Sequence, residues 1–176
     1  MAELTPSQKA KLAEIVNDPV KWAQAFLITW NGDKKCYSPW TARWYQAEML
    51  RDKSKKKVYR CGRRTGKTET MVIEALYQTY KNPNYRVLII TPYINQVDLA
   101  FKRINELVDA SPAIKARVVR QVKNPYQLEF SNHSSILGFT TGASSGSGGA
   151  SIRGQRADLL ILDEVDYMSE ADFDSV

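Results

Sequence analysis

Cys61-Gly62-Arg63-Arg64-Thr65-Gly66-Lys67-Thr68 is the most informative segment of the sequence. It fits the phosphate-loop pattern G-x-x-x-x-G-K-[ST], except that Cys61 stands in place of the first glycine. Gly62, one position later, is expected to provide the flexibility that the loop needs. In such a loop, backbone N–H groups and the positive end of the following helix surround phosphate groups. The segment therefore predicts a nucleotide site formed by these eight residues, with Lys67 at the β- and γ-phosphates and the Thr68 hydroxyl at Mg²⁺.

A second motif, Leu159-Leu160-Ile161-Leu162-Asp163-Glu164, lies near the end of the chain. Its four apolar residues predict a buried strand, and Asp163 at the carboxyl end is placed to hold Mg²⁺ through water. Glu164 is expected to polarise the attacking water as general base. Taken alone, the first motif could be a chance G-K-T at a helix start, and the second a strand followed by two solvated acids. Together they favour an active site whose cofactors are ATP and Mg²⁺.

The rest of the chain alternates between helical and extended patterns. Capping signals at Thr5 and Asp18 predict helices that begin at Pro6 and Pro19. The second of these is expected to bury a face that reaches Trp30. Further elements are expected in this order: helix 41–51, strand 57–60, helix 66–80, strand 86–90, a helix of about 14 residues around 97–108, strands 127–130 and 135–139, and strand 158–163.

Strands that alternate with helices predict an α/β fold with a mainly parallel sheet flanked by helices. We expect residues 1–50 to form a helical N-terminal segment that carries an adenine-recognition motif, and residues 51–176 to form the phosphate-loop (P-loop) ATPase core. The chain stops 13 residues after Asp163, where a sheet of this kind normally continues. We therefore expect the core to be incomplete at its C-terminus.

The charge of the chain favours a polyanionic partner. Its formal net charge is +6, and residues 51–67 hold nine basic side chains against one acidic side chain. Residues 158–176 instead hold seven acidic side chains and no basic one. A basic run is often only a solvated face, but this one leads directly into the phosphate loop. No apolar run is long enough for a membrane span, no secretory signal is visible, and two cysteines cannot build a disulfide framework.

Tyr45-Gln46 lies upstream of the loop and is the candidate adenine-binding pair. The glutamine amide offers a donor and an acceptor that can match the N6 and N7 edge of adenine. We expect Gln46 to read the base, with Tyr45 as the aromatic residue nearby for stacking. The alternative is a surface glutamine on a helix that packs against the core.

Four arginines are candidates for contacts with phosphate. Arg63 and Arg64 lie inside the loop, where a guanidinium group could contact phosphate oxygens or a neighbouring subunit, and Arg64 is included among the catalytic candidates. Arg153 and Arg156 lie between a glycine-rich segment and the acidic motif. We favour Arg153 as an arginine finger because it follows the glycine-rich segment directly. The alternative for both is a simple surface arginine.

In combination, these motifs resemble the large terminase subunit of tailed bacteriophages, the motor ATPase that drives DNA into a capsid. The similarity runs through Trp40–Leu50, the basic stretch with its arginine-rich loop, Val87–Gln96 and Ile152–Glu164. A loop that lacks its first glycine is usual in this family, so Cys61 agrees with the resemblance. In having a glutamate directly after the strand aspartate, the sequence resembles the additional-strand class of P-loop ATPases.

The resemblance implies a Mg²⁺-dependent ATPase that powers translocation of double-stranded viral DNA into a procapsid in the host cell cytoplasm. It implies that Lys67, Thr68 and Asp163 bind MgATP and that Glu164 activates water. Arg153 would reach into a neighbouring subunit's site in a pentameric ring. The implied partners are double-stranded DNA, the portal protein, the small terminase subunit and like subunits, and no membrane is implied. The family's coupling motif and nuclease domain are absent from this chain, so no nuclease activity is expected of it.

Three other interpretations remain open. A superfamily 2 helicase-like translocase shares the glutamine, the loop and the Asp-Glu pair, although here Val165-Asp166 follows in place of Ala-Asp or Ala-His. The chain could instead be an ATP-binding fragment without turnover, against which Glu164 argues. A pure DNA-binding protein that uses the basic run 51–60 has no DNA-reading motif to support it.

Overall fold

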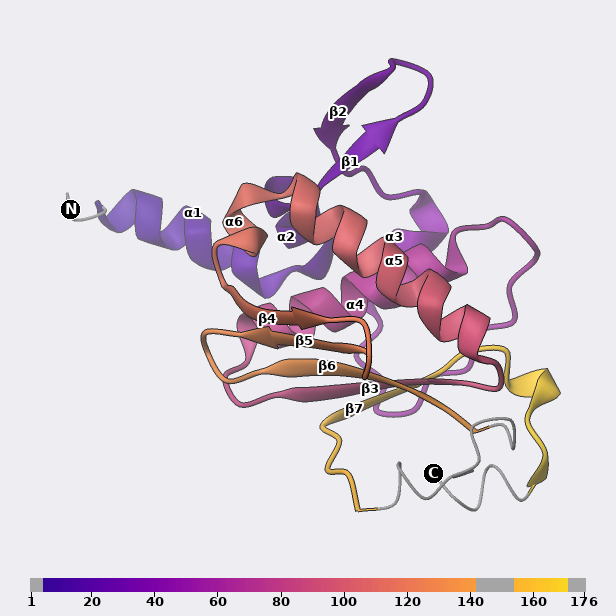
Figure 1. Cartoon of the computed structure of the whole chain (residues 1–176). Helices are drawn as coiled ribbons and strands as arrows, with labels where there is room; N and C mark the ends of the chain where they lie inside the picture. Colours follow the sequence, from indigo (N-terminus) through magenta and orange to yellow (C-terminus); the bar gives the residue numbers. More distant parts are fainter. Residues whose placement is uncertain (1–4, 142–153, 171–176) are drawn as a thin grey trace.

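A five-stranded sheet forms the base of the molecule, with strand order β4-β5-β6-β3-β7 (Figure 1). The computed structural model describes residues 5–141 and 154–170. β3 pairs in parallel with both β6 and β7, whereas β4, β5 and β6 are antiparallel neighbours. The half of the sheet formed by β6, β3 and β7 is therefore parallel, as the sequence predicts, whereas the half formed by β4, β5 and β6 is antiparallel. The strands are Arg86–Thr91 (β3), Val118–Val122 (β4), Gln127–Phe130 (β5), Ser135–Thr140 (β6) and Leu159–Leu162 (β7).

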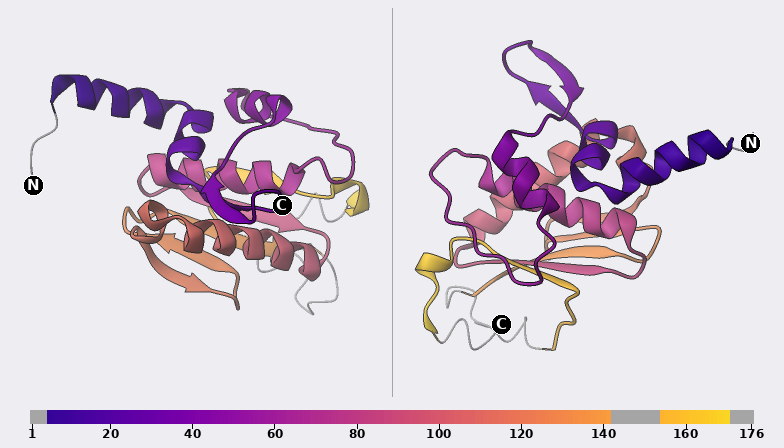
Figure 2. Two further views of the ribbon diagram at one scale, coloured as in Figure 1. Left: turned by 90° about the horizontal axis from the view of Figure 1, so that it is seen from above. Right: turned by 180° about the vertical axis from the view of Figure 1, so that it is seen from behind.

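Helices α4 (Lys67–Lys81) and α5 (Ile94–Ala110) lie on the same side of this sheet (Figures 1 and 2). Helices α2 (Pro19–Phe26) and α3 (Trp44–Arg51) pack against α4, and the short α6 (Pro112–Lys115) follows α5. The sequence predicts all these helices except α6, although α2 ends at Phe26, short of the predicted Trp30.

Strand β3 is buried on both faces, as its continuous apolar sequence predicts. Val87 and Ile89 belong to the main core beneath the helices. Leu88 and Ile90 point to the opposite face, since side chains alternate along a strand, and there they form a small cluster with Leu162. By contrast β7 is only partly covered, and Leu160 is 41% exposed. The sequence interpretation of β7 as a buried strand is therefore only partly correct.

The N-terminal helix α1 (Pro6–Asn17) is capped as predicted but extends away from the body (Figure 1). The Thr5 hydroxyl accepts from the Gln8 N–H and the Gln8 side chain accepts from the Thr5 N–H, which completes a capping box. No α1 residue is buried. The next helix, α2, instead contributes buried residues to the core, and its Trp22 is fully buried. Asp18 caps this helix by accepting a hydrogen bond from the Val20 N–H.

A projecting hairpin replaces the end of the predicted second helix. Helix α2 ends at Phe26, and β1 (Ile28–Asn31) then pairs antiparallel with β2 (Cys36–Pro39). Trp30 is 54% exposed and packs edge-on against Tyr37, with ring centroids 5.3 Å apart. The expectation that Trp30 lies on a buried helical face is therefore wrong. The Ile-Thr-Trp run favours a strand, and Asn31 forms the turn by accepting backbone hydrogen bonds from the next residues.

Residues 57–60 do not form the expected strand. Val58 is 97% exposed, and the segment lies beside α3 and α4 and does not pair with any strand of the sheet. Lys57 pairs with Glu74 of α4 at 3.6 Å, and the Tyr59 hydroxyl donates to Asp52 at 2.8 Å. Polar side chains thus hold the segment against α3 and α4, which explains why its strand-like sequence does not give a strand here.

Gly138 of β6 is expected to be essential for packing between the sheet and α5. A β-carbon at this position would lie 2.6 Å from both Phe101 Cε2 and Val97 Cγ1. Overpacking of this kind costs about 2 kcal/mol. Gly138→Ala should therefore lower the free energy of unfolding by that amount in urea denaturation. The matched control is Gly32→Ala, where nothing lies within 4 Å of the added carbon. Equal unfolding midpoints for the two variants would contradict this packing.

Candidate nucleotide-binding site

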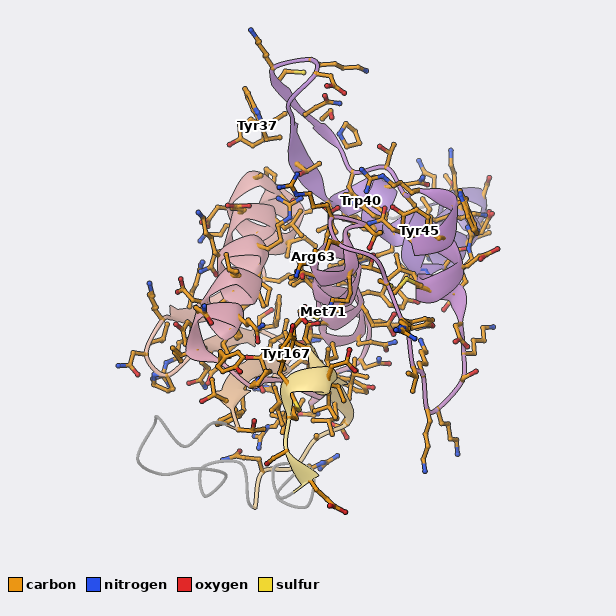
Figure 3. All side chains as sticks on the ribbon, turned by 90° about the vertical axis from the view of Figure 1, so that its right-hand side faces the viewer. Tyr37, Trp40, Tyr45, Arg63, Met71 and Tyr167 are labelled. Atoms are coloured by element: carbon orange, nitrogen blue, oxygen red, sulfur yellow. The ribbon has the colours of Figure 1, made fainter. Side chains whose placement is uncertain are left out.

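The loop segment and the acidic pair meet at the carboxyl end of the parallel strands. Helix α4 begins at Lys67 directly after the loop, and the Asp163 N–H donates to the Ile90 carbonyl at 3.0 Å. In open α/β sheets, ligands bind outside this end of the strands. Figure 3 looks onto this end of the molecule, where the labelled Tyr45, Arg63 and Tyr167 come from α3, the loop and the 3-10 helix η2 (Val165–Tyr167).

The conformation of the loop suits anion binding at the N-terminus of α4. Gly66 is the N-cap of α4 with φ +82°, a left-handed conformation that glycine adopts readily. Arg64 also has a positive φ, +60°, and the Thr65 hydroxyl donates to the Gly62 carbonyl at 3.0 Å. Strained non-glycine residues of this kind occur often at ligand sites. The first N–H groups of α4 and the positive end of its dipole are thus directed at the loop.

Lys67 lies between the two carboxylates of the acidic motif. Its ammonium Nζ is 2.8 Å from Asp163 Oδ1 and 2.8 Å from Glu164 Oε1. Burial alone would lower the pKa of this ammonium, but the hydrogen bonds to both acids outweigh it and raise the pKa above its usual value. Lys67 is therefore fully charged at neutral pH. Lys67 and Asp163, 96 positions apart in the sequence, therefore lie in direct contact, as a shared site would require.

The two acids lie in different environments. Asp163 is 8% exposed, and its Oδ1 also accepts from the Glu164 backbone N–H at 3.0 Å. Glu164 has a left-handed backbone, with φ +56° and ψ +41°, and its side chain is 36% exposed. The chain thus turns sharply after β7 and presents both carboxylates to Lys67. Asp163 is fixed and shielded, whereas Glu164 is accessible to water.

The donor set suits a Mg²⁺ ion that is held together with phosphate oxygens. Mg²⁺ in nucleotide sites uses one or two carboxylates or hydroxyls, while phosphates and waters supply the other ligands. Thr68 in the first turn of α4 and Asp163 after β7 are groups of that type. In residues 5–141 and 154–170, no group of three or more His, Cys, Asp or Glu side chains could hold a metal by itself.

Helix α3 contacts the loop through the predicted pair and through one residue that the sequence analysis missed. The Tyr45 hydroxyl donates to the Thr65 carbonyl at 2.8 Å, and Arg43 Nη1 donates to the same carbonyl at 3.4 Å. Gln46 is 2% exposed, accepts from the Arg43 N–H and lies 3.5 Å from the Gly66 carbonyl. The alternative of a surface glutamine is wrong. No motif signals Arg43, because its contact depends on how α3 packs beside the loop.

The remaining candidates are not all brought to the site. Arg63 and Arg64 are exposed on the loop, and Cys61 at its start is half-buried. Arg156 is 77% exposed and pairs with Asp158 at 3.1 Å, at the amino end of β7, whereas the site lies at its carboxyl end. Arg153 lies outside the described residues.

A further ion pair ties the first turn of α4 to α5. Arg103 contacts Glu69, the residue after Thr68, and donates to the Thr29 hydroxyl at 2.9 Å. Desolvation would lower the pKa of this guanidinium, but its hydrogen bonds to Glu69 and Glu106 outweigh that effect and raise the pKa above its usual value. No motif in the sequence indicates this contact, which joins residues 34 positions apart.

Gly66→Ala is expected to destabilise the protein at the loop. A β-carbon would lie 2.8 Å from the buried Gln46 Nε2, and alanine at φ +82° costs about 1–2 kcal/mol. Gly62→Ala is the matched control, because its β-carbon would make only an ordinary contact at 3.6 Å with Thr65. Thermal denaturation should show a lower midpoint for Gly66→Ala alone. Equal midpoints would contradict the close approach of Gln46.

Comparison with known proteins agrees with this geometry. The family model described as DEAD/DEAH box helicase matches residues 46–176, well over half of the chain. The chain belongs to the DEAD/DEAH box helicase family. The match begins at Gln46 and includes the loop, α4 and the acidic pair. The chain departs from the residues that give this family its name, since Val165-Asp166 follows Asp163-Glu164.

The relatives of this DEAD/DEAH-family chain include phage terminases, as the motifs indicate. The large terminase subunit of Thermus virus P23-45 is 27% identical over 129 residues, which cover 68% of this chain and 27% of that protein. The large terminase ATPase domain of Thermus phage P74-26 and a mutant of it match with TM-scores of 0.63 at 22% and 20% identity. Each match covers 77% of this chain and 60% of the solved chain. The chain thus spans about a quarter of the curated relative, and the structures confirm the fold.

Among the helices that the structure describes, none is both long and apolar enough to span a membrane.

Proposed function

We propose that this chain is the ATPase part of a phage large terminase subunit: a Mg²⁺-dependent ATPase that powers translocation of double-stranded viral DNA into a procapsid. The observation that carries the proposal is Lys67, which is 2.8 Å from both Asp163 and Glu164 at the N-terminus of α4. A phosphate-binding lysine, a shielded metal-binding acid and a water-accessible acid are the parts that nucleotide hydrolysis requires. We propose DNA packaging as the process that ATP hydrolysis drives because the chain is similar to terminases.

The chemistry would begin with an exchange of partners at Lys67. In this structure the ammonium pairs with both carboxylates. Triphosphate at the loop would draw Lys67 to its β- and γ-phosphates, which frees Glu164 to accept a proton from water. Asp163 and Thr68 would hold Mg²⁺, which when bound neutralises charge on the phosphate oxygens. Nucleotide binding and release of the general base are thus the same event.

The other loop residues would complete the binding of the nucleotide. Backbone N–H groups of residues 61–66 surround the phosphates, and Arg63 and Arg64 extend this positive surface. Arg64 would also stabilise charge that develops on the transferred phosphoryl group. We place the adenine at α3, beside the Tyr45 ring. Reading of the base by Gln46 would require its buried amide to leave the Arg43 N–H and the Gly66 carbonyl.

The proposed partners follow from the similarity to terminases. They are double-stranded DNA, a portal protein, a small terminase subunit and like subunits in a pentameric ring, in the host cell cytoplasm. We propose no nuclease activity for residues 1–176. The basic side chains of segment 51–64 are exposed, except for Lys57, which pairs with Glu74, and we propose that they contact an anionic partner.

Arg153→Ala tests the ring. If Arg153 completes a neighbour's site, its removal should leave ATP affinity unchanged and lower turnover of the assembled ring by roughly 1,000-fold, the value of an arginine finger. ATP affinity and hydrolysis are measured with and without assembly on portals. The control is Arg156→Ala, whose side chain pairs with Asp158. Unimpaired turnover of the Arg153→Ala ring would contradict a role in trans.

A helicase-like translocase is the second candidate, and the family match favours it. The two functions differ in what ATP turnover does to a duplex. ATP hydrolysis that needs Mg²⁺, is stimulated by double-stranded DNA and leaves the strands annealed would support the packaging motor. Strand separation of a labelled duplex would support the helicase. Binding of ATP with no turnover under any condition would show a nucleotide-binding fragment and overturn the proposal.

A further inference from the structure

The Tyr45 hydroxyl has a role that base recognition does not explain. It donates to the Thr65 carbonyl at 2.8 Å, across 20 positions of sequence, and the contact is partly buried. Arg43 Nη1 donates to the same carbonyl at 3.4 Å and to the Tyr45 hydroxyl oxygen at 3.2 Å. Two side chains of the α3 start therefore converge on one peptide group of the phosphate loop.

The peptide that they hold is the one between Thr65 and Gly66. The C=O and N–H of a trans peptide point in opposite directions, because the group is planar. A Thr65 carbonyl fixed toward α3 therefore turns the Gly66 N–H away from α3, to the other side of the loop. That N–H precedes Lys67 and belongs to the set that would surround the phosphates.

The surroundings leave this peptide little freedom to rotate. Gly66 has φ +82°, and a β-carbon there would lie 2.8 Å from Gln46 Nε2 and 3.5 Å from Arg43 Nη1. The Gln46 side-chain oxygen Oε1 in turn accepts from the Arg43 backbone N–H at 3.0 Å. Arg43, Tyr45 and Gln46 thus form one hydrogen-bonded unit against Thr65 and Gly66, and we name this unit the α3 clamp.

We propose that Tyr45 is a positioning residue: through the Thr65 carbonyl, its hydroxyl aims the Gly66 N–H at the polyphosphate of the nucleotide. This inference rests on the proposed binding of phosphate by the loop. It assigns the hydroxyl to the phosphate end, whereas stacking by the Tyr45 ring concerns the base. The two roles are separable, since phenylalanine keeps the ring and removes only the hydroxyl.

The test is isothermal titration of the whole chain with Mg-ATP and, separately, with Mg-tripolyphosphate, which has no base. Tyr45→Phe should weaken both ligands by the same factor, about five-fold for one lost hydrogen bond. The number of sites should stay at the wild-type value, because a purely structural defect lowers the folded fraction and not the affinity of the folded molecules. Tyr37→Phe is the matched control on the exposed hairpin and should change neither affinity.

Each outcome separates the inference from the function on which it rests. If the wild type binds neither ligand, the proposed function fails. If the wild type binds both and Tyr45→Phe binds them equally well, or loses affinity for ATP alone, the positioning role is overturned. If Tyr45→Phe does not fold, Arg43→Ala replaces it: removal of this second donor should again weaken tripolyphosphate and ATP alike, and unchanged affinities would overturn the α3 clamp.

Discussion

Lys67→Ala is expected to weaken ATP binding roughly 100-fold and to abolish hydrolysis, because charge-assisted hydrogen bonds to phosphate are among the strongest that a side chain makes. The same change also removes the cation that pairs with the shielded Asp163. Fluorescence titration with a labelled ATP measures the affinity, and phosphate release measures turnover.

Lys81→Ala provides the control for this experiment. It removes the same charge from the last turn of the same helix, where Lys81 lies near Tyr77 and away from the acidic pair. We expect ATP affinity and turnover as in the wild type. Retention of tight ATP binding by Lys67→Ala would show that the nucleotide does not bind at the N-terminus of α4.

Glu164→Gln is expected to keep ATP binding and to lower turnover by roughly 100-fold or more, the usual contribution of a general base. The glutamine has nearly the same shape and keeps an acceptor oxygen for Lys67, but it cannot take a proton from water. Because Asp163 is unchanged, the metal-binding position is intact. Single-turnover hydrolysis with saturating ATP measures the effect directly.

The neighbouring Asp166 provides the control for charge. Asp166→Asn removes one negative charge from η2, two residues beyond Glu164, and should leave hydrolysis unchanged. If Glu164→Gln hydrolyses ATP at the wild-type rate, another group activates the water and the assignment of the base is wrong.

The sequence predicted those elements whose apolar pattern is long and regular. Helices α4 and α5 and strand β3 follow from spacing alone, because burial of one stripe or of a whole strand leaves a strong periodic signal. The meeting of Lys67 with Asp163 and Glu164 was also predictable. Parallel strands end at one edge of a sheet, and both motifs are attached to that edge.

The errors lie where tertiary contacts outweigh local pattern. Trp30 fits a helical stripe, yet the short run Ile28–Asn31 finds a partner in β2 and the tryptophan stays exposed. Residues 57–60 look like a strand, yet Lys57 and Tyr59 bind groups on or after the helices. Strand β4, absent from the sequence analysis, is stabilised by pairing with β5. Whether such a short segment forms a strand depends on which element lies beside it in the fold. The local sequence does not specify that neighbour.

The same limit applies to the site. The sequence singles out Tyr45 and Gln46 as a candidate adenine-binding pair, but it does not indicate their contacts with the loop, since these depend on the angle at which α3 meets the loop. Arg43 joins them without any motif of its own. The distinction between a shielded Asp163 and an accessible Glu164 likewise required the coordinates, because both follow the same strand.

A crystal structure of the chain with Mg²⁺ and a non-hydrolysable ATP analogue tests the central claim most directly. The account predicts the triphosphate at the N-terminus of α4, with the Lys67 ammonium on its β- and γ-phosphates and the metal held by Thr68 and Asp163. Glu164 should then be free of Lys67 and face the γ-phosphate. An analogue bound elsewhere, with Lys67 still paired to Asp163 and Glu164, would contradict it.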